Sequence, residues 1–155
     1  MDLEPTMKVL QALQNEEARY VVVGAVALNL LGLARMTRDL DIFEDPTPDN
    51  IERLKRALSS VFSDPHIAEI SASDLAGEYP AIAYVPPEGD FSIDILSRLG
   101  EAFAYADIEA QMVSFDGLSI RVATPAMLYR IKKDTVRLQD RADAERLRER
   151  FGLVG

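Results

Sequence analysis

The chain has 155 residues, 48% of them hydrophobic, no cysteine and a formal net charge of −9. That length suits one domain that buries its own core, so residues 1–155 are expected to form a single domain. The charge argues against a protein that coats nucleic acid, and one histidine without cysteine excludes a His/Cys zinc site and a cysteine nucleophile.

The N-terminal part of the chain alternates helical and strand patterns. Residues 5–17 have apolar side chains at helical spacing, and residues 19–24 are a β-branched run that predicts a strand. A glycine ends this strand and allows a sharp turn into a helix over residues 25–32. Residues 39–43 predict the next strand, and residues 45–62 combine a cap, early prolines and a helical pattern.

The C-terminal part predicts more strands and then helices. Residues 81–86 and 91–96 are strand-like runs, and residues 110–125 predict a hairpin around an Asp-Gly turn. Residues 125–151 predict two helices or one bent helix. This irregular mixture favours an α/β (α+β) fold, a small mixed sheet flanked by helices.

Hydropathy and charge suggest where the protein works. No apolar run approaches the roughly 20 residues of a membrane span, and the first ten residues lack an export signal, so we expect a cytoplasmic protein without a membrane partner. Residues 121–155 hold nine basic against five acidic side chains, a local balance of +4. This basic segment is either attracted to a phosphate-bearing ligand or a solvated helix face.

Three aspartates stand out from the other acids by their context. Five acid-x-acid pairs occur, about as many as chance gives, so spacing alone is uninformative. Asp39 and Asp41, however, alternate with apolar residues on one predicted strand, and Asp94 repeats the pattern on another. If the strands are neighbours, the three carboxylates share a site that needs a cation or protons. Oxygen ligands favour a hard divalent ion, most simply Mg²⁺.

The turn at Gly24 supplies the other half of a candidate site. When a strand ends in glycine and a helix follows directly, the unpaired backbone N–H groups at the N-terminus of the helix face the turn. Such N–H groups bind phosphate. Phosphate binding beside a carboxylate-held Mg²⁺ is the equipment for phosphoryl or nucleotidyl transfer. The alternatives are plain surface acids and an ordinary turn glycine.

These motifs resemble the nucleotidyltransferase fold of the DNA polymerase β superfamily. The matching segments are "VGA", "GLARMTRDLDIF", "IDI" and the closing "RVATPAMLYRIKKDTVRLQDRADAERL". Within the superfamily the sequence is most similar to small bacterial proteins of the AbiEii-like and minimal nucleotidyltransferase type. The resemblance covers nearly the whole chain and implies a single-domain nucleotidyltransferase fold.

The resemblance also implies residue roles. Asp39 and Asp41 would hold one or two Mg²⁺ ions, and Asp94 would complete the second site and help to activate the attacking hydroxyl. Position 25 is usually serine or glycine in this superfamily, and Ala25 leaves only backbone contacts with phosphate. The nucleotide-binding residues implied are Gly24, Ala25, Arg35, Thr37, Arg38, Lys132 and Arg137.

The function implied is Mg²⁺-dependent transfer of a nucleotide from an NTP, by default ATP, to an acceptor hydroxyl on protein, tRNA or a small molecule. The rival interpretation is a partner in a toxin–antitoxin pair that binds a nucleotide or a cognate toxin or antitoxin with little turnover. Phosphoester hydrolysis is a third alternative. The "RLQDRAD" cluster either faces the triphosphate or forms a ladder of ion pairs along one helix.

Overall fold

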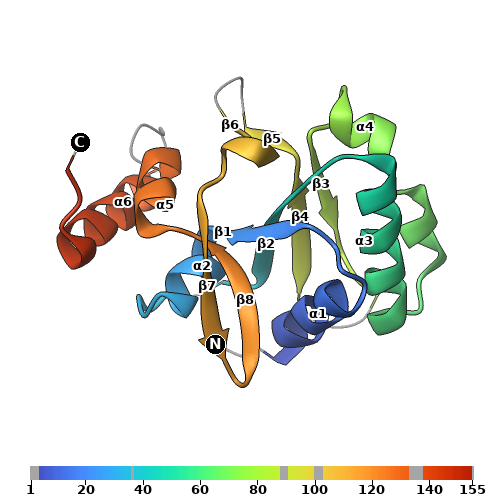
Figure 1. Cartoon of the computed structure of the whole chain (residues 1–155), viewed down its shortest axis with the longest axis horizontal. Helices are drawn as coiled ribbons and strands as arrows, with labels where there is room; N and C mark the ends of the chain where they lie inside the picture. The colour runs from blue at the N-terminus through green and yellow to red at the C-terminus, as the bar shows by residue number, and fades with distance from the viewer. Residues whose placement is uncertain (1–3, 36, 88–90, 100–102, 133–137, 155) are drawn as a thin grey trace.

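A six-stranded sheet in the order β3-β4-β2-β1-β8-β7 organises the protein (Figure 1). This computed structural model describes residues 4–35, 37–87, 91–99, 103–132 and 138–154. β2 runs parallel to β4 and β1 parallel to β8, while the other neighbours are antiparallel, so the sheet is mixed as predicted. The strands are β1 (Tyr20–Val23), β2 (Asp39–Glu44), β3 (Ala81–Tyr84), β4 (Ser92–Leu96), β7 (Ala110–Phe115) and β8 (Leu118–Ala123).

Helices flank this sheet. α1 and α3 pack against each other on one face, and α5 and α6 lie together on the side of the molecule away from α3 (Figure 1). The helices are α1 (Glu4–Asn15), α2 (Gly24–Leu30), α3 (Pro48–Val61), α4 (Ala72–Ala76), α5 (Pro125–Lys132) and α6 (Leu138–Phe151). Shorter elements are the 3-10 helices η1 (Pro65–Glu69) and η2 (Tyr105–Asp107) and the strand pair β5 (Arg98–Leu99) and β6 (Phe103–Ala104).

Each longer element lies within a few residues of its predicted range. The predicted hairpin is β7–β8, with Asp116 and Gly117 both at positive φ in its turn. In the described residues, the predicted helical end of the chain consists of two helices, α5 and α6, rather than one bent helix. The sequence predicted none of the short elements η1, α4, β5, β6 and η2, because segments of two to five residues are too short to show a period.

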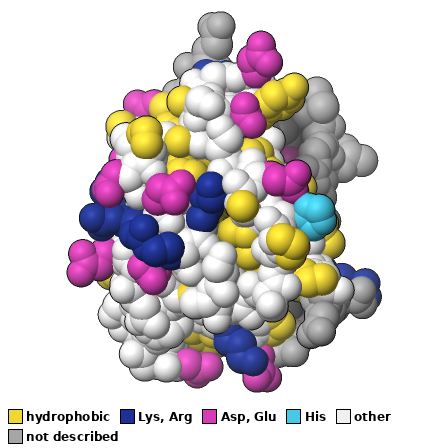
Figure 2. All heavy atoms as spheres, turned by 90° about the vertical axis from the view of Figure 1, so that its right-hand side faces the viewer, with side chains coloured by type: hydrophobic (Ala, Val, Ile, Leu, Met, Phe, Trp, Pro, Cys, Tyr) yellow, Lys and Arg dark blue, Asp and Glu magenta, His cyan; other side chains and the backbone are white. Residues whose placement is uncertain are grey.

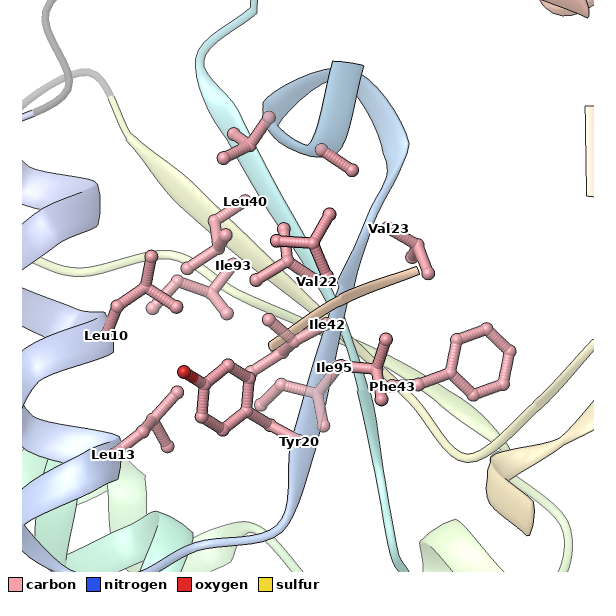
Figure 3. Close-up of a cluster of buried hydrophobic side chains, with 14 of the residues drawn as sticks. Leu10, Leu13, Tyr20, Val22, Val23, Leu40, Ile42, Phe43, Ile93 and Ile95 are labelled. Atoms are coloured by element: carbon pink, nitrogen blue, oxygen red, sulfur yellow. The ribbon is translucent and has the colours of Figure 1, made fainter. Parts of the chain in front are cut away.

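The main core lies between the sheet and the α1–α3 layer. Leu40 and Ile42 of β2 and their neighbours Ile93 and Ile95 of β4 are fully buried. Figure 3 shows these side chains directed toward Leu10 and Leu13 of α1, while Phe43 and Val23 are directed to the other side of the strands. Because successive strand residues alternate between faces, Asp39 and Asp41 lie on the face opposite α1.

A buried polar hub fastens α3 to the strands. The Asn50 side chain accepts a hydrogen bond from the Arg19 backbone N–H (2.7 Å) and donates to a carboxylate oxygen of Glu44 (3.0 Å). It also donates to the carbonyls of Arg19 and Asp45. Glu44 is fully buried, and burial raises its pKa well above the usual value. Its second oxygen has no partner among the described residues, so Glu44 depends on Asn50.

We expect Asn50→Ala to lower the free energy of unfolding by about 2–4 kcal/mol, because it leaves Glu44 and three backbone groups without their partner. Urea unfolding followed by circular dichroism measures this. Glu52→Ala, at an exposed position of the same helix, is the control and is expected to change it by less than about 0.5 kcal/mol. Equal effects of the two substitutions would contradict this role of Asn50.

Surface charges on the α3 side of the molecule are compensated. Figure 2 shows acidic and basic side chains interspersed on this face. Ion pairs that involve α3 include Arg56 with Glu16 (3.2 Å) and Lys55 with Glu52 (3.5 Å). No helix within the described ranges is long and apolar enough to cross a membrane.

Candidate functional site

A row of residues crosses four strands on the sheet face opposite α1. Asp41 of β2 is the register partner of Asp94 of β4 on one side and of Val23 of β1 on the other. Asp94 in turn pairs with Ala83 of β3. The two predicted strands are therefore direct neighbours, and two of the three predicted carboxylates meet at one level of the sheet.

The meeting of these carboxylates perturbs Asp41. Burial, a side-chain hydrogen bond with Asp94 and the negative charges of Asp94 and Asp39 together raise the pKa of Asp41 to about 7, against an opposing effect of Lys132. A hydrogen bond between two carboxyl groups requires a shared proton. The negative charges of Asp41 and Asp94 therefore repel each other unless a shared proton or a bound cation reduces this repulsion.

The third carboxylate lies one step away. Asp39 is on the same face of β2, two residues before Asp41, and accepts a hydrogen bond from the Ser92 hydroxyl. In the described part of the chain, no three His, Cys, Asp or Glu side chains form a group arranged to hold a metal ion. Carboxylate oxygens are suitable ligands for a hard divalent cation, and Asp41 and Asp94 lie side by side with Asp39 nearby. Asp39, however, accepts the hydrogen bond from Ser92 in this structure.

The raised pKa of Asp41 predicts a pH dependence of stability in the metal-free protein. Between the ordinary pKa of 3.8 and about 7, the folded protein retains a proton that the unfolded chain releases. The stabilisation that the folded protein gains by holding this proton on Asp41 is fully present below pH 3.8 and is lost as the pH rises through about 7. In EDTA, we expect the melting temperature of wild type to fall from pH 5 to pH 8 relative to Asp41→Asn, measured by scanning calorimetry. Parallel curves for the two proteins would contradict this.

Gly24 brings the backbone close to Asp41. Its φ of +70° favours glycine, and it is the first residue of α2 directly after β1. A Cβ atom added here would overlap the Asp41 carboxylate and lie 2.9 Å from its Cγ. Position 24 therefore favours glycine for two reasons: the backbone has a positive φ, and a side chain would overlap the Asp41 carboxylate.

A cavity of about 610 Å³ opens over the carboxylate pair. Of the predicted site residues, Gly24, Asp41, Asp94 and Lys132 line it. Asp140 contributes a further carboxylate, and the other lining residues among those that the structure describes are apolar. The apolar lining residues are Val23, Ala81, Ile82, Ala83, Leu96, Leu99, Phe103, Leu128 and Ile131.

Lys132 enters this cavity from a buried ion-pair network. Its ammonium group lies 3.1 Å from Asp140 Oδ1 and 3.4 Å from Asp143 Oδ2. Asp143 is fully buried and its Oδ2 also lies 3.4 Å from the Nε of Arg35. Asp140 and Asp143 of α6 thus pair with Lys132 of α5, and Asp143 also pairs with Arg35 from the segment before β2. This network connects the C-terminal helices to both sides of the site.

Removing the Asp143 charge is expected to loosen this network. Asp143→Asn leaves Lys132 and Arg35 under-compensated around a buried position, and we expect a loss of about 2–3 kcal/mol in unfolding free energy. Glu145→Gln, in an exposed ion pair within the same helix, is the control and is expected to change the unfolding free energy much less than Asp143→Asn. Chemical denaturation compares them. An Asp143→Asn protein as stable as wild type would rule out this structural role.

The remaining predicted residues that the structure describes are not part of the cavity lining. The Thr37 hydroxyl accepts a hydrogen bond from the Asp39 backbone N–H (3.1 Å) and so orients the start of β2. Arg38 is exposed and its carbonyl accepts from the Ser92 backbone N–H. Ala25 is the second residue of α2. Arg137 lies outside the described residues.

The predicted site residues did not include Asp140, the apolar lining of the cavity, or Asp143, which pairs with Lys132 behind it. Asp143 falls in a charge-rich helix where spacing alone suggests a ladder of ion pairs, so only the fold shows that it is buried. The alternation of Ala81 and Ala83 with larger residues was available as a signal, but two alanines carry no chemistry by themselves.

Comparisons with known proteins show the family and the fold of the chain. The family model "Nucleotidyl transferase AbiEii toxin, Type IV TA system" matches residues 8–132. Among solved structures, TM1012 from Thermotoga maritima, described as a nucleotidyltransferase, is similar at 18% identity and a TM-score of 0.56, with 97% of this chain and 92% of that chain covered. No curated protein sequence matches.

A second neighbour is ANT(2″)-Ia. Its structure with adenylyl-2″-tobramycin has 14% identity and a TM-score of 0.57, covering 97% of this chain and 91% of that one. Its solution structure has the same identity and a TM-score of 0.60, covering 97% and 84%. At these identities the likeness shows the fold alone.

Proposed function

Because the chain belongs to the AbiEii nucleotidyl transferase family, we propose that it transfers a nucleoside monophosphate from a nucleoside triphosphate, ATP first, to an acceptor hydroxyl. The observation that carries this proposal is the register pairing of Asp41 with Asp94, which places both carboxylates in one cavity of about 610 Å³ with Asp41 beside Gly24. The raised pKa of Asp41 supports it, since a site poised between a proton and a cation suits divalent-ion binding.

Asp41 and Asp94 would hold a divalent cation, Mg²⁺ first, and Asp39 would join them by giving up its hydrogen bond with Ser92. The ion, when bound, offsets the charge of the phosphates and makes the acceptor hydroxyl more acidic. Lys132 faces the same cavity and adds a positive charge for the triphosphate. The bare backbone at Gly24 lets the phosphates approach Asp41 without a clash.

The reaction is a displacement at the α-phosphorus. A bond forms between the acceptor oxygen and the α-phosphorus, and the bond from that phosphorus to the oxygen bridging to the β-phosphate breaks. Pyrophosphate leaves with the electron pair. The Asp94 carboxylate accepts the hydroxyl proton, because Asp94 is the site carboxylate farther from Gly24 in the row.

The four α-³²P-labelled NTPs with Mg²⁺ and a cell extract, separated into protein, RNA and small-molecule fractions, test this proposal. We expect label in one fraction with wild type and none with Asp41→Asn. With the same nucleotide labelled at the γ-position, wild type is expected to transfer no more label than Asp41→Asn, which separates nucleotidyl transfer from phosphoryl transfer by this protein. Transfer of the γ-label by wild type in excess of Asp41→Asn would overturn the proposed reaction.

The family description as a toxin of a type IV toxin–antitoxin system favours the toxin role for this chain, with a cognate antitoxin encoded beside it. Induced expression of wild type is then expected to stop bacterial growth, whereas Asp41→Asn is expected to be tolerated. Equal toxicity of the two proteins would favour the second candidate, a binding partner without turnover. The engagement of Asp39 with Ser92 and the alanine at position 25 are the observations that favour that candidate.

A further inference from the structure

The row of residues across the sheet has two different ends. From Asp94 and Asp41 it continues on one side to Val23, where Gly24 begins α2, and on the other side to Ala83 of β3. β3 is the last strand of the sheet in this direction. The site is therefore bounded by a covered strand at one end and by a sheet edge at the other.

Displacement at phosphorus requires the attacking and leaving oxygens to lie roughly in line, on opposite sides of the phosphorus. With the leaving phosphates beside Gly24 and Lys132, the attacking hydroxyl comes from the side of Asp94. Among the described residues, β3 is the strand of this sheet that lies beyond Asp94. The acceptor group is accordingly placed at the β3 end of the cavity.

We infer that the acceptor reaches the site across β3 and carries its hydroxyl on an uncharged, largely apolar group; this inference rests on the proposed nucleotidyl transfer. Ala81 and Ala83 are exposed and also line the cavity, so the rim there is low and apolar. Leu96, the register partner of Ala81, and Phe103 line the cavity as well. Burial of an apolar group on this surface lowers the free energy of binding, whereas burial of a phosphate there removes its hydration and raises that free energy.

The surface outside the cavity continues this character. In the described part of the chain, β3 pairs only with β4, so its other edge is open for backbone hydrogen bonds. Tyr79 before β3 and Val85 after it are 58% and 66% exposed. A tyrosine or other hydroxyl-bearing side chain on an extended polypeptide, and a small phenol or alcohol, share the chemistry that fits this surface.

Ala83→Leu tests the inference, with Ala76→Leu as its control. A leucine at position 83 is larger than alanine and narrows the path by which the acceptor is proposed to enter the cavity. Ala76 is exposed on α4 and is not part of the cavity lining, so the same substitution there leaves this path unchanged. Two quantities are measured for each variant. One is transfer of label from [α-³²P]ATP to the fractions of a cell extract, and the other is the Kd for Mg²⁺ and α,β-methylene-ATP by calorimetry.

We expect Ala83→Leu to lower transfer at least tenfold and to change the Kd by less than twofold, with Ala76→Leu unchanged in both. Wild-type label is expected in the protein or the small-molecule fraction, and those two fractions distinguish the sources. Label in RNA would overturn the apolar acceptor. Full transfer by Ala83→Leu, or a loss of nucleotide affinity instead, would overturn the approach across β3. If wild type bound the analogue but labelled nothing, the proposed function itself would fail.

Discussion

Asp41→Asn is expected to lower nucleotidyl transfer at least about 10³-fold, which corresponds to about 4 kcal/mol of transition-state stabilisation. The reason is its position: Asp41 touches Asp94, lies beside Gly24 and is the most strongly perturbed carboxylate of the cavity. An amide cannot replace its charge toward a cation. Steady-state release of pyrophosphate from MgATP, with the acceptor fraction identified above, measures the loss.

The fold is expected to survive this substitution. Asp41 faces away from the core that Leu40 and Ile42 join, and the asparagine no longer needs a shared proton. Circular dichroism and the melting temperature at pH 8 verify that the variant is folded. A folded Asp41→Asn protein with more than a tenth of wild-type turnover would refute the role assigned to Asp41.

Gly24→Ala is expected to lower transfer about 10²-fold or more. The added Cβ overlaps the Asp41 carboxylate, so that carboxylate must move, and a displacement of about 1 Å at a reacting centre costs on the order of 10²-fold. The backbone φ of +70° adds strain of roughly 1–2 kcal/mol. Turnover and unfolding free energy are both measured.

Gly117→Ala separates these two effects. Gly117 has nearly the same backbone conformation, φ +77°, but a Cβ there meets no atom within 4 Å. The backbone strain is common to both variants, so Gly24→Ala is expected to lose more stability than Gly117→Ala because of the added overlap with Asp41, and only Gly24→Ala is expected to lose activity. Comparable turnover in the two variants would show that the close approach to Asp41 has no functional meaning.

The strand carboxylates were predictable from the sequence for a physical reason. Acids that alternate with apolar residues on a strand face away from the core, so the sequence predicts one face for Asp39 and Asp41 and an equivalent position for Asp94 on its own strand. What the sequence left open was whether the two strands are neighbours. The parallel pairing of β2 with β4 answers that, and it places Asp41 level with Asp94.

The basic residues were harder to interpret. Lys132 was recognised through its family resemblance, but its contacts with Asp140 and Asp143 arise from the packing of α5 against α6. Charge spacing within one helix cannot show pairing between elements. Arg35 is similar: its partner Asp143 lies 108 residues away in the chain. Long-range ion pairs of this kind depend on the tertiary fold and leave no local signal.

The family and the geometry together favour turnover over binding alone. Membership of the AbiEii family makes nucleotidyl transfer the expected chemistry. Asp39 accepts a hydrogen bond from the Ser92 hydroxyl, and this bond must break before Asp39 can bind a metal ion together with Asp41 and Asp94. If Ser92→Ala bound Mg²⁺ more tightly than wild type by calorimetry, Asp39 would be shown to exchange one partner for the other.

Binding of Mn²⁺, followed by electron paramagnetic resonance in the presence and absence of α,β-methylene-ATP, tests the central claim most directly. The account predicts that wild type binds Mn²⁺ together with the nucleotide analogue, and that Asp41→Asn loses this binding by at least tenfold while remaining folded. Binding of the analogue by wild type with no protein-bound Mn²⁺, or unchanged Mn²⁺ binding by Asp41→Asn, would contradict the assignment of Asp41 and Asp94 as a cation-binding catalytic pair.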